Sequence, residues 1–326
     1  MPDPNPEAAH TAGPVVGVDV GGTKTHIVAS NGATSIDVVI PSPTWRHGSL
    51  FDDVANFDRL SAAVTRAVGA PPRATVVGAH GVDNAEQRVR ATALLGERLA
   101  GSVEVVNDAV LLAPAMGRDS AICVIAGTGS IVVGVGASGE PIAADGHGWL
   151  IADDASAPGL ARGAVLAVLR AVDRGGPAAL ADPLARTLLD AVGASDHVEL
   201  ALRFQAGASE ESWGSLAPRL FEAVAAGSPL ARTVVERAAA HLADLVVAVR
   251  ERGARGSDVI AAGGVMTAQP ALATGLRTAL AERDGSLSVS VLDTAPAWGA
   301  LELARRLADS ATPSSAPTRP VSKGTP

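Results

Sequence analysis

One pattern occurs twice in this chain of 326 residues: an apolar strand, a corner of glycine and threonine, a second apolar strand and a glycine turn. The first copy is VVGVDVGGTKTHIVASNG, residues 15–32, and the second is AICVIAGTGSIVVGVGASGE, residues 121–140. At an offset of 107 residues, three positions of the two copies align: Gly22 with Gly129, Val28 with Val135, and Gly32 with Gly139. An internal duplication of this kind predicts two related folding units.

Helix-like and strand-like segments alternate after each copy. In the first half, helical patterns at 57–70 and 85–100 alternate with strand patterns at 73–81 and 103–110. This alternation predicts α/β units with parallel or mixed sheets. The second half contains a long Ala/Leu-rich helical region, about 157–252, which indicates an insertion or an enlarged helical part of the second unit.

These patterns predict an N-terminal domain over residues 14–117 and a C-terminal domain over 118–309, facing each other across a cleft. The boundary is expected near Met116–Arg118, where a short helix broken by Pro114 precedes the second hairpin. The final helix could pack on the first domain. Residues 1–13 and 310–326 are rich in proline, serine and threonine, and we expect both ends to be disordered.

Composition restricts the partners. The net charge is −8 with both signs scattered, so the chain offers no basic face for nucleic acid or anionic lipid. No apolar run approaches the roughly 18 residues of a membrane span, and we expect no membrane partner. The one cysteine, Cys123, excludes a disulfide framework, a cysteine-based zinc site and an iron–sulfur cluster held within the chain, and it indicates a reduced, cytoplasmic setting.

The two corners carry the polar residues between apolar strands. Glycine and threonine at a hairpin tip let the backbone approach a ligand and direct N–H and hydroxyl donors at a phosphate, although an ordinary hairpin can have the same sequence. Lys24 stands in the first corner of a chain with two lysines in all, and Asp19 ends the strand before it. Asp19 has no acidic counterpart in the repeat, so we expect it to bind magnesium beside a triphosphate.

Two further strand ends carry chemistry. Asn107 and Asp108 end one strand and open a helix, where they could cap the helix or place a carboxylate beside a substrate hydroxyl. Gly263 and Gly264 follow a later strand, where they could pack helix against strand or let a purine or ribose lie on the backbone. Neither corner has the spacing of a Walker A loop or of a dinucleotide-binding loop.

The order of these motifs resembles the sugar kinase, Hsp70 and actin superfamily. DVGGTKT at 19–25 is similar to its phosphate-1 motif, GTGS at 127–130 to its phosphate-2 motif and AGGV at 262–265 to its adenosine motif. Within it, the segments VVGAHGVDNAEQR, VVNDAV, VIAGTGS and DGHGWLIADDAS resemble the N-acetylglucosamine kinase and BadF/BadG-type ATPase family over roughly residues 14–306.

The resemblance implies an α/β fold of two ribonuclease-H-like domains, as in actin-like ATPases, and an ATP-dependent sugar kinase with magnesium. It implies that Asp108 is the general base and that Asp19 binds the metal. The implied cofactor-binding residues are Gly21, Gly22, Thr23, Lys24, Thr25, Gly127, Thr128, Gly129, Ser130, Gly263 and Gly264. The implied sugar-binding residues are His80, Gly81, Asp83, Asn107, Gly146, His147 and Asp153. We also expect a homodimer.

The sugar-facing segments depart from the family pattern. N-acetylglucosamine kinases of this family usually carry one Asn in the loop matching PSPTWRHGS, another after the phosphate-2 serine, and the segments GGWG and GDEGS. This chain has Pro43 or Thr44, Ile131, DGHG at 145–148 and ADDAS at 152–156. The phosphate and base positions match better than the sugar positions, so the transfer chemistry is better supported than the choice of sugar.

Three functions compete. The leading one is phosphorylation of a sugar hydroxyl, with an amino sugar such as N-acetylglucosamine or glucosamine giving the 6-phosphate. The second, an activator ATPase for a radical dehydratase, needs bridging cysteines that this chain lacks. The third is a protein that senses nucleotide or sugar on the same fold without turnover. Asp19 and Asp108 favour catalysis over sensing.

Overall fold

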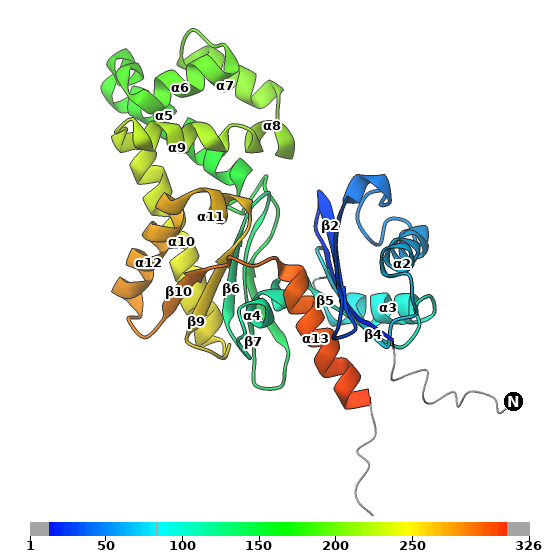
Figure 1. Cartoon of the computed structure of the whole chain (residues 1–326). Coiled ribbons are helices and arrows are strands. Elements are labelled where there is room, and N and C mark those ends of the chain that lie inside the picture. Colours follow the sequence, from blue (N-terminus) through cyan, green and yellow to red (C-terminus); the bar gives the residue numbers. More distant parts are fainter. Residues whose placement is uncertain (1–12, 83, 312–326) are drawn as a thin grey trace, which may run out of the picture. The chain divides into compact units, whose positions relative to one another are not determined.

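The computed structural model describes residues 13–82 and 84–311, and these form two compact units (Figure 1). Unit 1 contains the described residues up to Leu111 together with 296–311, and unit 2 contains residues 112–295. The chain therefore leaves unit 1 at Leu111, a few residues before the expected boundary, and returns to it for its last helix.

Unit 1 is built on a five-stranded mixed sheet in the order β3-β2-β1-β4-β5. The strands are β1 (Val15–Val20), β2 (Lys24–Ser30), β3 (Ser35–Pro41), β4 (Ala74–Ala79) and β5 (Ser102–Asn107). β1, β2 and β3 pair antiparallel, whereas β1, β4 and β5 pair parallel. Helices α2 (Ala55–Val68) and α3 (Ala85–Gly96) supply the crossovers that parallel pairing requires.

Unit 2 repeats this topology. Its sheet has the order β10-β9-β6-β7-β8, which is the order of unit 1 written in reverse. The strands are β6 (Ile122–Ala126), β7 (Ser130–Val135), β8 (Pro141–Asp145), β9 (Asp258–Ala262) and β10 (Ser288–Val291). The duplication and the two-domain α/β fold predicted from the sequence are confirmed at the level of strand order and direction.

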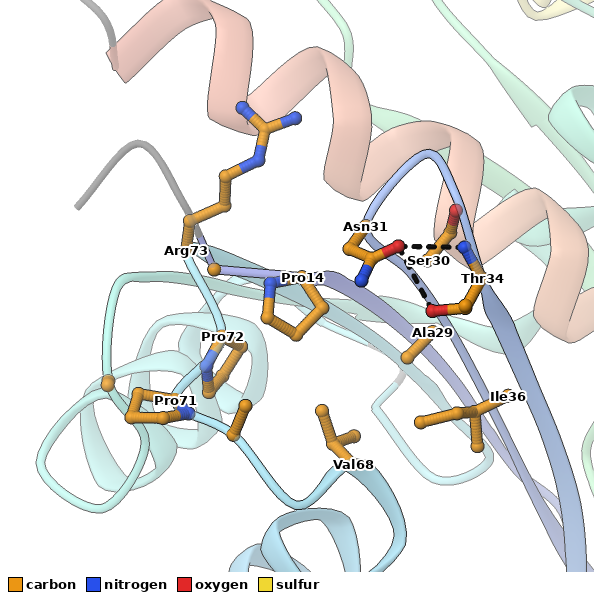
Figure 2. A pocket seen from close by; sticks show the side chains of 13 residues that line it. Pro14, Ala29, Ser30, Asn31, Thr34, Ile36, Val68, Pro71, Pro72 and Arg73 are labelled. Carbon is orange, nitrogen blue, oxygen red and sulfur yellow. Dashed lines mark hydrogen bonds between the residues drawn. The ribbon is translucent and has the colours of Figure 1, made fainter. Parts of the chain in front are cut away.

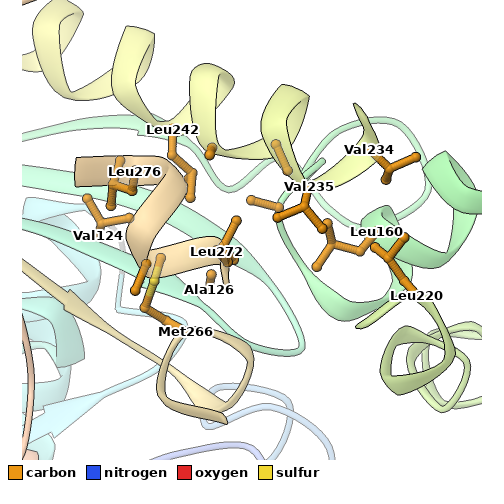
Figure 3. Packing of buried hydrophobic residues seen from close by; sticks show 14 of the residues in the cluster. Val124, Ala126, Leu160, Leu220, Val234, Val235, Leu242, Met266, Leu272 and Leu276 are labelled. Carbon is orange, nitrogen blue, oxygen red and sulfur yellow. The ribbon is translucent and has the colours of Figure 1, made fainter. Parts of the chain in front are cut away.

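The enlarged helical part of unit 2 lies between β8 and β9. It contains α5 (Ala157–Gly175), α6 (Pro183–Val192), α7 (His197–Ala206), α8 (Glu210–Gly214), α9 (Ala217–Ala225) and α10 (Pro229–Glu251). Two more helices, α11 (Gly264–Ala268) and α12 (Pro270–Arg283), separate β9 from β10. Figure 3 shows Val124 and Ala126 of the sheet beside Leu242 and Leu276 of the helices, within one continuous core.

Local sequence explains where the main helices begin. Asn84 and Gln87 form a capping box at α3, in which each side chain bonds the other's backbone N–H. Ser156 and Ser228 cap α5 and α10 with their hydroxyl oxygens, and a proline stands at the first or second position of each helix. None of the described helices combines the length and apolarity that a membrane crossing requires.

The last helix, α13 (Pro296–Ala311), covers one face of the unit 1 sheet. Ala297, Ala300 and Leu301 are fully buried against β-strand residues that include Val28 and Val76. Gly17, in the middle of β1, makes this close approach possible, because a Cβ there would lie 2.6 Å from the carbonyl oxygen of Ala297 and against the backbone of Leu301.

We predict that Gly17→Ala destabilises unit 1 by about 1–3 kcal/mol, because a helix backbone cannot move aside as a side chain can. Chemical denaturation followed by circular dichroism would measure the loss. Gly96→Ala is the matched control, since Gly96 lies in α3 with open space around its Cβ position, and alanine there should be neutral or stabilising by up to about 1 kcal/mol. Equal stability of the two variants would contradict the close packing of α13.

Candidate functional site

The polar residues of unit 1 meet where its parallel strands end. β1 and β5 both flank β4, and the register pairs Asp19 with Gly78 and Asn107 with Ala79. His80 follows directly, with its backbone N–H bonded to the carbonyl oxygen of Val20. The carboxyl edge of a parallel sheet is where α/β proteins bind ligands. The sequence placed these residues at separate strand ends, and the fold brings them to one edge.

Two carboxylates interact at this edge. Burial, together with the nearby negative charge of Asp108, raises the pKa of Asp19 to about 7, although Lys24 opposes the rise. A buried carboxylate beside a second one favours either a proton or a cation. Among the described residues, no group of three or more His, Cys, Asp or Glu side chains is arranged to hold a metal. Mg²⁺ usually takes one or two carboxylates and completes its shell with phosphate oxygens and water, and the Asp19 carboxylate is a ligand of the kind that it prefers.

The side chain that caps the turn after β5 is that of Asn107. Its Oδ1 accepts a hydrogen bond from Ala109 N at 3.0 Å, and its Nδ2 donates to Val82 O at 3.2 Å. Asp108 has 24% of its side chain exposed, and its Oδ2 lies 3.9 Å from Nδ1 of His80, which is 71% exposed. Asn107 thus caps the turn that Asp108 opens.

Buried hydrogen bonds between hydroxyl groups hold the first corner in place. Thr25 Oγ1 lies 2.9 Å from Ser42 Oγ and accepts a hydrogen bond from Trp45 Nε1, while Ser42 Oγ donates to Gly21 O at 2.8 Å. Thr25 is fully buried, so its side chain supports the corner rather than presenting a donor to a ligand. Gly22, Thr23 and Lys24 are exposed.

Glycine at position 22 is not required by the chain itself. A Cβ there would meet nothing within 4 Å, and the residue does not adopt a positive φ. The same holds for Gly264 at the start of α11. Gly263 differs, because it has a φ of +99° and its Cβ would strike the backbone of Ala126. Gly22 and Gly264 therefore leave room for something outside the chain, whereas Gly263 serves the fold.

The second corner, residues 127–130, lies against the α11 loop and α5 within unit 2. A Cβ on Gly127 would be 3.4 Å from Gly264 N, and Gly127 O accepts a hydrogen bond from Ala157 N at 2.7 Å. Thr128 is exposed, but Ser130 is buried. The exposed tip of this corner is therefore Thr128, flanked by two half-buried glycines.

The loop after β8 is held in place by Arg162 of α5. The guanidinium donates to the carbonyl oxygens of Trp149, Leu150 and Ala152 at 2.7–2.9 Å and to Asp154 Oδ1 at 2.6 Å. Gly146 and His147 are exposed on this loop, whereas Asp153 is 5% exposed. Ile131, which stands where an Asn was expected, lies against Gly146, since a Cβ there would be 3.0 Å from its Cδ1.

The predicted site residues are thus distributed over both units. The exposed or half-buried ones are Asp19, Gly21, Gly22, Thr23, Lys24, His80, Gly81, Asn107, Asp108, Gly127, Thr128, Gly129, Gly146, His147, Gly263 and Gly264. Asp83 lies outside the described residues. Sequence reasoning missed Ser42 and Arg162, and no spacing signal marks either of them.

A pocket of about 610 Å³ lies elsewhere in unit 1 (Figure 2). Its walls come from the start of β1, the end of β2, the turn after it and the segment before β4, with Pro14, Asn31 and Arg73 among the lining residues. This is the end of the sheet where β1 and β4 begin, opposite to Asp19 and Asp108. Its size therefore does not make it the site of the chemistry that those carboxylates support.

Comparison with known proteins identifies the family of this chain. The model of the BadF/BadG/BcrA/BcrD ATPase family matches residues 16–304. The chain belongs to this family of ATPases. The N-acetylmuramic acid/N-acetylglucosamine kinase of Clostridium acetobutylicum is 26% identical to it over 247 residues, which are 73% of this chain and 79% of that enzyme.

Solved structures share the fold. A candidate N-acetylglucosamine kinase from Chromobacterium violaceum superposes with a TM-score of 0.65 at 23% identity, covering 90% of this chain and 99% of that one. A ROK family glucokinase from Streptomyces griseus, solved with glucose and AMPPNP, gives 0.55 at 19% identity, covering 90% and 100%. The two-domain fold of the actin-like ATPases, expected from the motif order, is confirmed.

We predict that Asp19→Asn makes the protein more stable at pH 8 than the wild type. Because the pKa of Asp19 is raised on folding, the folded wild type binds an extra proton between about pH 4 and 7, so its stability falls as pH rises through this window. One pKa unit is worth about 1.4 kcal/mol. The difference in Tm between variant and wild type should grow from pH 5 to pH 8.

Asp53→Asn serves as the control for this pH series. The Arg59 side chain and the Ala55 N–H hold the pKa of Asp53 below its usual range, so its charge is constant over these pH values. Its difference from the wild type should not change with pH. If the Tm difference between Asp19→Asn and the wild type is also independent of pH, the pKa of Asp19 is not raised on folding.

We also predict that Gly22→Ala lowers nucleotide binding without unfolding the chain, because its methyl group meets no protein atom and would occupy space above the corner. The shift in Tm caused by Mg·ADP should shrink, while the Tm of the free protein stays within about 2 °C of the wild type. Gly96→Ala is the control, because Gly96 also has open space at its Cβ position and does not adopt a positive φ. An unchanged Mg·ADP shift would remove Gly22 from the nucleotide site.

Proposed function

We propose that this chain is an ATP-dependent kinase that transfers the γ-phosphoryl group of ATP to a hydroxyl of a sugar. The observation that carries the proposal is the pair Asp19 and Asp108 at the carboxyl edge of unit 1, where burial and then the charge of Asp108 raise the pKa of Asp19. Membership of an ATPase family supports the use of ATP.

In this proposal the glycine and threonine corners of the two units bind the phosphates through backbone N–H groups and the hydroxyls of Thr23 and Thr128. Asp19 binds Mg²⁺, which neutralises negative charge on the phosphates when it is bound. Lys24 adds a positive charge at the first corner. Gly264 leaves room for the nucleoside to lie on the backbone.

Asp108 acts on the acceptor. Its carboxylate accepts the hydrogen bond of the sugar hydroxyl and takes the proton as the oxygen forms its bond to the γ-phosphorus and the bond to ADP breaks. Asp108 suits this role because its side chain is 24% exposed at the carboxyl edge of the sheet. His80 lies close enough to Asp108 to orient it or to contact the sugar.

We further propose an amino sugar as the acceptor, N-acetylglucosamine or glucosamine, phosphorylated at its 6-hydroxyl. The curated relative, which acts on N-acetylmuramic acid and N-acetylglucosamine, supports this class. His80, Gly81, Gly146 and His147 are the exposed residues available to bind it. Ile131 and His147 differ from the expected family residues, so a different sugar remains the alternative substrate.

The structure gives a second argument against the activator-ATPase alternative. The one cysteine, Cys123, is buried in β6, where burial raises the pKa of its thiol to about 12, so it is not presented at the surface to share a cluster with a second subunit. A sensing protein without turnover stays open as the second candidate. A cytoplasmic location, a homodimer and the lack of nucleic-acid and membrane partners stay predictions.

The test is ADP release, measured with a coupled assay over N-acetylglucosamine, glucosamine, N-acetylmuramic acid and neutral hexoses. We expect at least one amino sugar to stimulate ADP release above the rate with ATP alone. Nucleotide binding without stimulation by any sugar would favour the sensing protein. A neutral hexose as the best acceptor would correct the sugar class and keep the kinase.

Asp108→Asn should lower turnover of the best sugar by roughly 100- to 10,000-fold, because the amide cannot accept the hydroxyl proton. Its Tm and its Mg·ADP shift should stay near wild-type values, since the turn is capped by Asn107. The control is Asp58→Asn, which removes an exposed carboxylate of α2 that pairs with Arg98. This variant should leave turnover unchanged. If Asp108→Asn retains most of the activity, another carboxylate is the base.

A further inference from the structure

Asp145, the last residue of β8, has a backbone conformation that non-glycine residues rarely adopt. Its φ is +68°, in the left-handed region that favours glycine. The side chain is 5% exposed and accepts two hydrogen bonds, one at Oδ2 from Ser130 Oγ at 2.9 Å and one at Oδ1 from Asp153 N at 3.2 Å. Non-glycine residues in such conformations cluster where function requires them.

Asp153 also binds backbone groups of the second corner and of the loop after β8. Its Oδ2 accepts from Ser130 N at 3.4 Å, and its Oδ1 accepts from Gly148 N at 3.1 Å. Both hydrogen-bond donors of Ser130 are therefore directed at carboxylates, one at Asp145 and one at Asp153. Ser130, predicted to contact the cofactor, instead joins the corner to the two carboxylates beneath it.

Two buried carboxylates close to a phosphate-binding corner would repel phosphate unless their charge is balanced. His241 of α10 supplies a balancing charge, with Nε2 3.6 Å from Asp145 Oδ2. The carboxylates that act on His241 are Asp145, Asp154 and Asp244, and contact with Asp145 raises the pKa of the imidazole. Burial opposes ionisation of Asp145, but His241 and Ser130 together hold its pKa below the usual range.

We infer that Asp145 is a positioning residue for nucleotide binding: it fixes Ser130 and, through Asp153, the second corner, while His241 balances its charge. The inference rests on the proposed function, because it takes the second corner as a phosphate-binding element. It gives a role to two residues that were not among the predicted site residues, Asp145 and His241.

Asp145→Asn is the informative substitution. Asparagine tolerates the left-handed conformation and keeps the size of the side chain, so the fold should survive. The two present hydrogen bonds go to different oxygens of Asp145, and asparagine replaces one of these acceptors with an NH₂ donor and carries no charge. We expect the Kd of Mg·AMP-PNP, measured by titration calorimetry, to rise about tenfold, as typical for loss of a hydrogen bond to a charged group. The Tm of the free protein should stay within about 2 °C of the wild type.

Ser130→Ala tests the same hydrogen bond from the other side and should also raise the Kd. His241→Gln should raise it in the wild type but add nothing to Asp145→Asn, because its effect passes through Asp145. The matched control is Glu222→Gln, which removes an exposed carboxylate of α9 that pairs with Arg219 and does not act on His241 or Asp145. Its Kd should equal that of the wild type.

The outcomes separate the inference from the proposed function. A Kd within twofold of the wild type for both Asp145→Asn and Ser130→Ala overturns the positioning role, whether or not a sugar is phosphorylated. Wild-type protein that binds Mg·AMP-PNP but phosphorylates no sugar overturns the kinase and leaves the comparison of Kd values decisive. Wild-type protein that binds no nucleotide overturns both.

Discussion

Parallel pairing of β4 with both β1 and β5 decides where the polar residues of unit 1 meet. Parallel strands start at one edge of a sheet and end at the other, so residues that follow each strand gather at a single edge. Asp19, His80 and Asp108 are 28 to 89 positions apart in sequence terms and become neighbours for this reason alone. The second sheet has the same strand order, and its corner at 127–130 occupies the equivalent place.

Both units bury carboxylates, but they balance the charge differently. In unit 1, Asp19 has Asp108 as a like-charged neighbour and Lys24 as an opposing charge, which leaves its pKa near 7 and its oxygen atoms suited to a cation. In unit 2, Asp145 accepts hydrogen bonds from Ser130 and Asp153 and pairs with His241. These contacts hold its pKa below the usual range although burial opposes them. The pKa of the buried carboxylate is thus raised in unit 1 and lowered at Asp145 in unit 2.

The sequence was sufficient for the duplication, the α/β class and the strand ends that carry Asp19 and Asp108, because alternation and glycine corners are local signals. It was insufficient for side chains whose role depends on distant partners. Thr25 and Ser130 sit in motifs that predict ligand contacts, yet Trp45, Ser42, Asp145 and Asp153 occupy their hydroxyl or amide groups. Asp145 stands in the DGHG segment that departs from the family pattern, but its role could not be predicted from the sequence, since it depends on a positive φ and on a contact with His241 of α10.

The return of α13 to unit 1 has a consequence for biosynthesis. The apolar face formed by Val15, Val28, Ala74 and Val76 is complete as soon as β4 and β5 have left the ribosome, but the helix that covers it is made almost 190 residues later, after Ala295. During that interval the face is exposed or covered by something else, such as a chaperone. Unit 2, contiguous from 112 to 295, has no such delay and can finish folding first.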